Sequence, residues 1–201
     1  MKVVSHSVLE KTRRILGAEH PVTLTSMGNL ALTYWDQGRS AEAAALEEEV
    51  LEKCRRILGL EHPETLTLMN NLASTYWDQG RTAEAAALRE EVLQKRRQIL
   101  GEEHPDTLAS MANLANTYSD QGRTGEAAAL QEEVLWKRRR ILGEEHPDTL
   151  SAMNNLAITY SDQGRTGEVA VLQEEVLRKF RRILGEEHPD TLKAMATIGL
   201  T

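Results

Sequence analysis

A repeat of 42 residues constrains the fold of this 201-residue chain more than any other feature of the sequence. Two consecutive copies, 101–142 and 143–184, differ at only 8 of 42 positions. A period of roughly 20–50 residues is typical of solenoids and arrays, in which each unit packs only on its neighbours. We therefore expect an open stack of similar units. The dipeptide His-Pro marks the period at His20, His62, His104, His146 and His188.

Each copy has the pattern of two helices. In the third copy, Pro105 suits the first position of a helix, and the apolar residues that follow fit a period of 3.6 residues and not of two. Gly122 is expected to end this helix in a left-handed conformation, and Thr124 to cap the second helix. The expected fold class is therefore all-α, built of antiparallel helix pairs. The second helix is expected to bury a stripe made of Ala127, Leu130, Val134, Leu135, Ile141 and Leu142.

Alignment of the copies sets the boundaries of the units. Residues 1–16 correspond to part of a second helix, and residues 185–201 correspond to part of a first helix. We expect residues 1–201 to form a single solenoid, and we expect the chain to be a piece of a longer array because it starts and stops within units. The four full units span residues 17–58, 59–100, 101–142 and 143–184.

Composition argues against several classes of partner. The chain has 24 Lys and Arg against 31 Asp and Glu, and this net charge of −7 disfavours a general nucleic-acid binder. No run of about 18 apolar residues is present, so no membrane-spanning helix is expected. Cys54 is the one cysteine and cannot form an internal disulfide, which fits a reducing compartment. We expect a cytoplasmic protein with neither a membrane nor a nucleic acid as partner.

The sequence gives little support for catalysis. Each full unit has one histidine with no second ligand at i+3 or i+4, which indicates a role at the helix start or in the joint, not a metal site. The carboxylates repeat with the period, so no unique acid–base pair stands out. Cys54 is replaced in the other copies, which disfavours a nucleophile. We expect no enzyme activity, no cofactor and no metal. The replacements are Arg96, Arg138 and Phe180.

The segment 113–127, Asn-Leu-Ala-x-x-Tyr-x-x-Gln-Gly-Arg-x-x-Glu-Ala, resembles the tetratricopeptide repeat. The joint 142–150 and the length of 42 residues are similar to the longer subclass found in kinesin light chains. Similar arrays occur as sensor regions of fungal and bacterial proteins that contain an NTPase. The resemblance covers essentially the whole chain. It implies a right-handed superhelix in which the first helices line a concave groove for extended peptides or partner helices.

One departure from the family lies in the second helix. Where the family usually carries an aromatic residue, this chain has polar residues, so the contacts between units are expected to rest on Leu, Val, Ile and Tyr. A superhelical pitch different from the family norm stays open as an alternative to the usual pitch. These polar residues are Glu47, Arg89, Gln131 and Gln173.

Four positions on one face of the first helix vary between the copies, whereas the apolar stripe does not. At ~100° per residue the varied positions share a face centred roughly 120° from that stripe. Because a core tolerates little change in volume, this face is expected to lie outside the core and to suit recognition. The alternative is relaxed packing at solvent. Trp35 and Trp77 either anchor a partner or cover the next helix. The residues assigned to this face are Leu32, Trp35, Asn70, Trp77, Asn116, Asn154 and Ile158.

An asparagine and an aspartate border the varied face in every full unit. An asparagine amide both donates and accepts, so it can pair with the backbone of an extended peptide, and the resemblance implies this role. The alternative is that it ties neighbouring helices together. The aspartate either faces the ligand or binds a nearby arginine or helix end. These residues are Asn29, Asn71, Asn113 and Asn155, with Asp36, Asp78, Asp120 and Asp162.

The expected function is a non-catalytic scaffold that binds a peptide or helix of another protein in this groove. The alternative is a structural array that stacks end to end and forms a homo-oligomer through its terminal helices. The apolar residues expected on those terminal faces are Leu9, Ile15 and Leu16 at one end, and Leu192, Met195 and Ile198 at the other.

Overall fold

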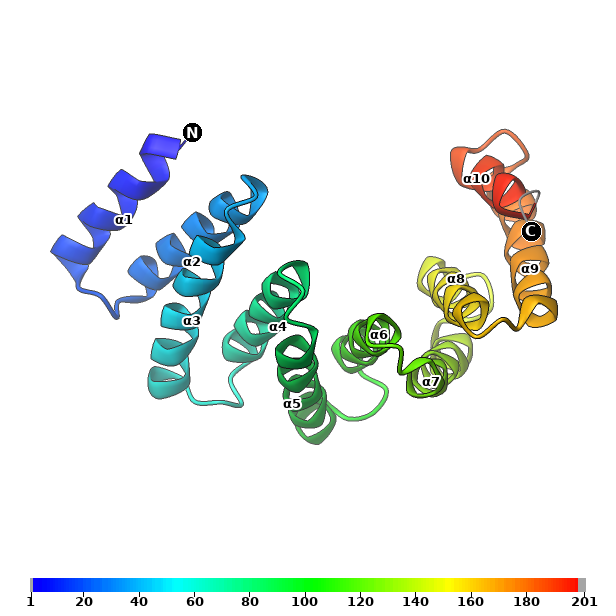
Figure 1. Cartoon of the computed structure of the whole chain (residues 1–201), viewed down its shortest axis with the longest axis horizontal. Helices are drawn as coiled ribbons and strands as arrows, with labels where there is room; N and C mark the ends of the chain where they lie inside the picture. The colour runs from blue at the N-terminus through cyan, green and yellow to red at the C-terminus, as the bar shows by residue number, and fades with distance from the viewer. Residues whose placement is uncertain (1, 199–201) are drawn as a thin grey trace. The chain divides into compact units, whose positions relative to one another are not determined.

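The computed structural model describes residues 2–198, without the side chains of residues 2–6 and 197, and these residues form helices with no strand (Figure 1). Two compact bodies divide the chain between residues 99 and 100. In each body, helices consecutive in the sequence pack on each other, as the all-α prediction requires. The N-terminal body contains α1 (Lys2–Leu16), α2 (Pro21–Asp36), α3 (Ser40–Ile57), α4 (Pro63–Asp78) and α5 (Thr82–Leu100). The C-terminal body contains α6 (Pro105–Asp120), α7 (Thr124–Leu142), α8 (Pro147–Asp162), α9 (Thr166–Leu184) and α10 (Pro189–Ile198).

The first helices α2, α4, α6 and α8 begin in the same way. Pro105 occupies the first turn of α6, and the His104 Nδ1 accepts a hydrogen bond of 3.2 Å from the backbone N–H of Asp106. This bond satisfies one of the amide groups that a helix start leaves unpaired. The expected role of the histidines at the helix start is therefore confirmed. The equivalent bonds are accepted by His20, His62, His146 and His188.

The turn between the paired helices depends on glycine and arginine. Gly122 has φ +73°, the left-handed conformation that was expected. The expectation that Thr124 caps α7 is wrong, because α7 begins at Thr124 and the preceding Arg123 makes no capping side-chain bond. The Arg123 guanidinium instead lies 3.7 Å from the centre of the Tyr118 ring and pairs with Glu126 at 2.7 Å. These contacts attach the turn to both helices of the pair.

The core of each unit is an apolar stripe of the first helix packed on the second helix. Met111 and Ala115 of α6 are fully buried, as are Ala127 and Val134 of α7. The expectation that Ile141 and Leu142 complete the stripe is wrong, because both are exposed. Since α7 has 19 residues against 16 in α6 and in α8, its last turn extends past the helices that cover it. The same holds for Ile57, Leu58, Ile99, Leu100, Ile183 and Leu184.

Ion pairs join one second helix to the next. Arg139 of α7 contacts Glu175 of α9 at 3.0 Å, and Arg55 of α3 contacts Glu91 of α5 at 3.2 Å. Pairs at i,i+4 also occur within the second helices, with Lys137–Glu133 at 2.5 Å as an example. Lys95 differs, because it pairs with Glu61 at 3.0 Å. The basic runs of the second helices are therefore engaged in contacts between units.

Candidate functional site

The varied face of the first helices lies mostly outside the core, as predicted. In α2 and α4, Trp35 is 45% exposed, Trp77 is 41% exposed, and Leu32 is exposed as well. Ala112, at the varied position that Asn70 and Asn154 hold in other units, contradicts the prediction, since it is 8% exposed and belongs to the core of α6. Its side chain is small enough for close packing, whereas Asn154, at the same position in α8, is exposed.

Three helices of the C-terminal body surround a cavity of about 570 Å³. Three predicted groove residues of α8 line it, namely Asn154, Ile158 and Asp162. The varied face of α8 therefore forms the wall of a hollow large enough for several side chains of a ligand. Residues that sequence reasoning did not assign to the groove complete the lining, among them Gln173, Val176 and Phe180 of α9, and Asp190, Lys193 and Ala194 of α10.

The polar residues at the aromatic position of the second helix reach the varied face. Gln131 is 0% exposed and donates from Nε2 to Oδ1 of Asn116 at 3.1 Å. Arg89 donates from Nη2 to Oγ of Ser74 at 3.2 Å. Each bond joins a varied first-helix residue to the residue 15 positions later. The contacts between the two helices of one unit therefore include polar bonds as well as apolar packing, and the joint variation of these two positions was the signal that could have revealed the pairing.

Glu47 occupies this position in α3, where the paired first-helix residue is Leu32 and offers no hydrogen-bonding group. The side chain is 6% exposed. Burial raises the pKa of the Glu47 carboxyl, and a hydrogen bond from the Thr75 hydroxyl acts in the opposite direction. Its Oε2 atom is buried and has no hydrogen-bond partner among residues 2–198. The N-terminal body therefore holds a buried carboxylate that is only half satisfied.

The bordering asparagines differ in their surroundings. Asn29 and Asn71 are exposed, and within the described part of the chain neither side-chain amide has a partner. Asn155 is half-buried. Asn70 and Asn113 are also half-buried and take part in contacts within the chain. The amides most open to a ligand are thus those of α2 and α4.

The bordering aspartates are all exposed at the ends of their helices. Asp78 accepts a hydrogen bond from Nε1 of Trp35, so α2 and α4 are joined at their ends. Arg39 pairs with Glu42, not with Asp36, and Asp36 has no side-chain partner among the residues described. Trp35 therefore contacts the next first helix and still exposes almost half of its surface. Asp120 makes contacts within the chain, and Asp162 lines the cavity.

Other chemistry has little support. Residues 2–198 contain no group of three or more His, Cys, Asp or Glu side chains arranged to hold a metal ion. None of the described helices has the length and hydropathy needed to cross a membrane. Cys54 is buried, and burial raises the pKa of its thiol, which disfavours the nucleophilic thiolate.

Sequence comparison places most of the chain within one family. Models described as tetratricopeptide repeat match residues 48–94 and 64–135, and further models of that description match residues 23–64 and 149–190. No curated protein matches the chain.

Solved structures give the same result. A crystal structure of nearly identical TPR-like repeats of kinesin-light-chain type from Podosopora anserina has 32% identity and a TM-score of 0.83, and it covers 91% of this chain and 87% of its own. A crystal structure of a variant of the same repeats has 32% identity and a TM-score of 0.84, with coverage of 90% and 85%. BtubC (BKLC) from P. vanneervenii has 22% identity, a TM-score of 0.79 and coverage of 99% and 80%, and it supports the fold alone.

Proposed function

Because this chain belongs to the tetratricopeptide-repeat family, whose members generally serve as non-catalytic scaffolds for protein–protein interaction, we propose that its first-helix face binds a peptide or helix of a partner protein. The observation that carries the proposal is the cavity of about 570 Å³ bordered by the varied residues of α8. A fixed helical frame combined with varied, accessible side chains suits the recognition of a particular ligand.

The asparagines and the varied apolar residues are expected to contact different parts of the ligand. The exposed amides of Asn29 and Asn71 can donate to and accept from a peptide backbone without reading its sequence. Leu32 and Trp35 supply apolar surface for ligand side chains in the N-terminal body, and Ile158 does so in the C-terminal body. Large anchors of this kind dominate the energetics of many interfaces. Sequence selectivity then comes from the varied positions.

The double substitution Asn29→Ala and Asn71→Ala is expected to reduce capture of partner proteins by about tenfold, because two backbone hydrogen bonds are lost. Purified protein is immobilised, exposed to a cell lysate, and the retained proteins are quantified by mass spectrometry. Gln94→Ala plus Gln98→Ala removes two exposed amides from α5, outside the face, and is the matched control. Equal loss of the same partners in both variants, at unchanged elution volume, would contradict the proposal.

A second function, end-to-end association with another copy, is favoured by one observation. Leu192 of α10 is 52% exposed, whereas Leu108 and Leu150 at the same position are each 3% exposed. Ile15 and Leu16 are also exposed, although equivalent residues are exposed throughout the chain, and Leu9 is buried, contrary to its expected place on a terminal face. The sedimentation coefficient is expected to rise with protein concentration and to become constant in Leu192→Lys. A coefficient independent of concentration in the unaltered chain would exclude this function.

We also infer a cytoplasmic location, which the single, buried Cys54 supports. The uninterrupted 42-residue period supports one continuous array over residues 1–201. The association with an NTPase stays a prediction from the resemblance.

A further inference from the structure

Charge is divided unevenly between the two kinds of helix in the N-terminal body. The first helices α2 and α4 contain no lysine or arginine, and they carry Asp36, Glu64 and Asp78. The basic residues of the second helix α3 are engaged in ion pairs, as Lys53 is with Glu49. A surface made by α2 and α4 therefore has negative charges with no basic residue of its own, and such a surface attracts cations.

The 42-residue register relates this surface to the cavity of the C-terminal body. Gln173 and Ile158 line that cavity, and three periods earlier the same positions are held by Glu47 and Leu32. Lys193, which also lines the cavity, corresponds to Thr67. The N-terminal body thus has a carboxylate in place of an amide and a threonine in place of a cation. Its version of the groove is the more acidic of the two.

The burial of Glu47 is a second observation, independent of this surface charge. The Glu47 side chain is 6% exposed, with one oxygen bonded by Thr75 and the other without a partner among the described residues. An unsatisfied buried carboxylate oxygen is unfavourable for folding. Arg89, at the same position one unit later, donates from Nη2 to Oγ of Ser74. A ligand that brings a donor would supply a partner for Oε2 of Glu47.

We propose that the α2–α4 acidic face, formed by Trp35, Asp36, Glu47, Glu64 and Asp78, binds an arginine-bearing extended segment of the partner protein. This inference rests on the proposed function, because it names the chemistry of the ligand in the same groove. A guanidinium group donates in a planar fork that matches a carboxylate, and it also stacks on an indole ring. Glu47 accepts the guanidinium N–H groups, and Trp35, fixed by its bond to Asp78, offers its exposed ring. Asp36 and Glu64 add negative charge at the rim.

The test uses three fluorescein-labelled peptides of equal length, in which threonine alternates with arginine, lysine or citrulline. Fluorescence anisotropy of the full chain is expected to show tightest binding of the arginine peptide, and about tenfold weaker binding of the uncharged citrulline peptide. Binding of the arginine peptide is expected to weaken between about 50 and 300 mM NaCl because salt screens exposed charges. Equal affinity of the citrulline or the lysine peptide would overturn the assignment to a guanidinium.

The substitution Glu47→Gln is expected to weaken binding of the arginine peptide about tenfold and to leave the citrulline peptide unchanged. Glutamine already occupies this position as Gln131 and Gln173, so the fold accommodates it. Without peptide the variant is expected to unfold at a higher temperature, because a buried charge is removed. The matched control is Glu52→Gln, which removes the same charge from α3 about 140° around the helix and is expected to change affinity less than about twofold.

Two results separate this inference from the proposed function. Equal loss of affinity in Glu47→Gln and Glu52→Gln would overturn the acidic-face assignment, as would tight binding of the citrulline peptide that still depends on Asn29 and Asn71. The proposed function itself would survive both. Failure of all three peptides to bind, together with partner capture that is insensitive to Asn29→Ala plus Asn71→Ala, would overturn both proposals.

Discussion

Replacing Met111 by alanine is expected to lower the free energy of unfolding by about 2–4 kcal/mol. Met111 is 0% exposed and lies in the centre of the α6 stripe. Truncating a fully buried methionine removes its apolar contacts and leaves a cavity that the surrounding helices fill only in part. Because each unit packs only on its neighbours, no distant part of the chain can compensate. Urea denaturation followed by far-ultraviolet circular dichroism measures the loss.

Met195 provides the matched control for this substitution. It occupies the same register position as Met111, on α10, but it is only half-buried. Met195 removes less apolar surface from water on folding than Met111 does. The substitution Met195→Ala is therefore expected to cost less than about 1.5 kcal/mol. A cost for Met195→Ala equal to that for Met111→Ala would mean that burial does not determine the effect.

Local signals allowed most helix boundaries to be predicted. Pro105 fixes its own φ near the helical value, and Gly122 adopts the left-handed conformation that a Cβ would disfavour, so α6 begins and ends where the sequence indicates. The exposure of Ile141 and Leu142 could not be predicted, because periodicity reports the direction of a side chain and not the length of the helices that face it. Thr124 does not cap α7, because it is the first residue of the helix and Arg123 holds the cap position.

The candidate site was predictable only in part. Comparison of equivalent positions identified the accessible face of the first helices, including Trp35 and Ile158. The comparison treated one helix at a time, whereas the cavity also needs residues of α9 and α10, such as Phe180 and Asp190. The bond between Gln131 and Asn116 depends on how the two helices of a pair meet, which the spacing within either helix does not reveal.

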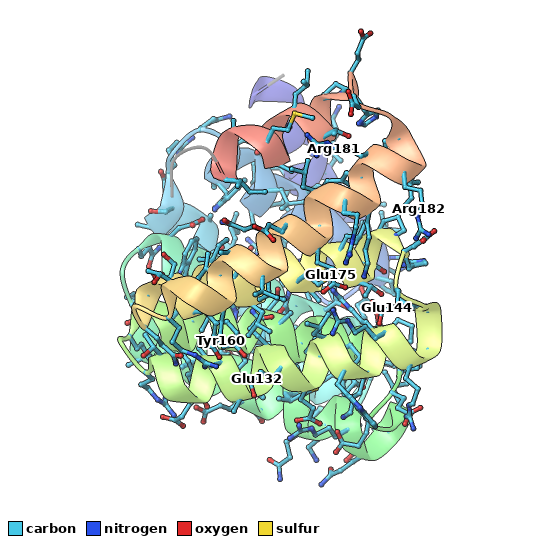
Figure 2. The ribbon with its side chains drawn as sticks, turned by 90° about the vertical axis from the view of Figure 1, so that its right-hand side faces the viewer. Glu132, Glu144, Tyr160, Glu175, Arg181 and Arg182 are labelled. Atoms are coloured by element: carbon cyan, nitrogen blue, oxygen red, sulfur yellow. The ribbon has the colours of Figure 1, made fainter. Side chains whose placement is uncertain are left out.

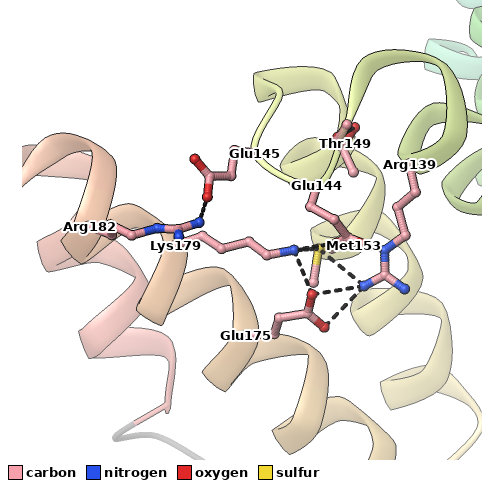
Figure 3. A network of polar contacts seen from close by, with 9 residues as sticks. Arg139, Glu144, Glu145, Thr149, Met153, Glu175, Lys179 and Arg182 are labelled. Carbon is pink, nitrogen blue, oxygen red and sulfur yellow. Dashed lines mark hydrogen bonds and ion pairs between the residues drawn. The ribbon is translucent and has the colours of Figure 1, made fainter.

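Polar contacts hold α9 to the rest of the C-terminal body, and several of its charged residues face its neighbours (Figure 2). Tyr160 of α8 donates to Glu132 of α7 at 2.8 Å, which joins two consecutive units. Lys179 of α9 is 7% exposed. Its Nζ contacts Oε1 of Glu175 at 2.5 Å and Oε2 of Glu144 at 2.6 Å (Figure 3). The Nη2 atom of Arg139 lies 3.0 Å from both oxygens of Glu175, so this carboxylate serves two cations.

The substitution Glu175→Gln is expected to lower the free energy of unfolding by about 2–3 kcal/mol. Removal of the Glu175 charge leaves the buried Lys179 desolvated and incompletely paired, and Lys179 and the partly buried Arg139 would share the exposed Glu144 alone. The control is Arg182→Gln, in the same helix as Glu175. It breaks an exposed pair between Arg182 and Glu145 and is expected to cost less than about 1 kcal/mol. Urea denaturation at neutral pH compares the variants, and equal losses would contradict the expectation.

The pH dependence of the Glu175→Gln effect follows from the same network. Burial alone would raise the pKa of the Glu175 carboxyl, but Lys179 and Arg139 outweigh it, so the pKa lies below the ordinary 4.5. A carboxyl whose pKa is lower in the folded state stabilises the fold fully above its unfolded pKa, and this contribution is lost as pH falls through the folded pKa. The difference between the original chain and Glu175→Gln is therefore expected to be largest near neutral pH and to shrink below about pH 4.5. A difference in unfolding free energy that stays constant down to about pH 3 would contradict the assignment of the effect to the lost charge.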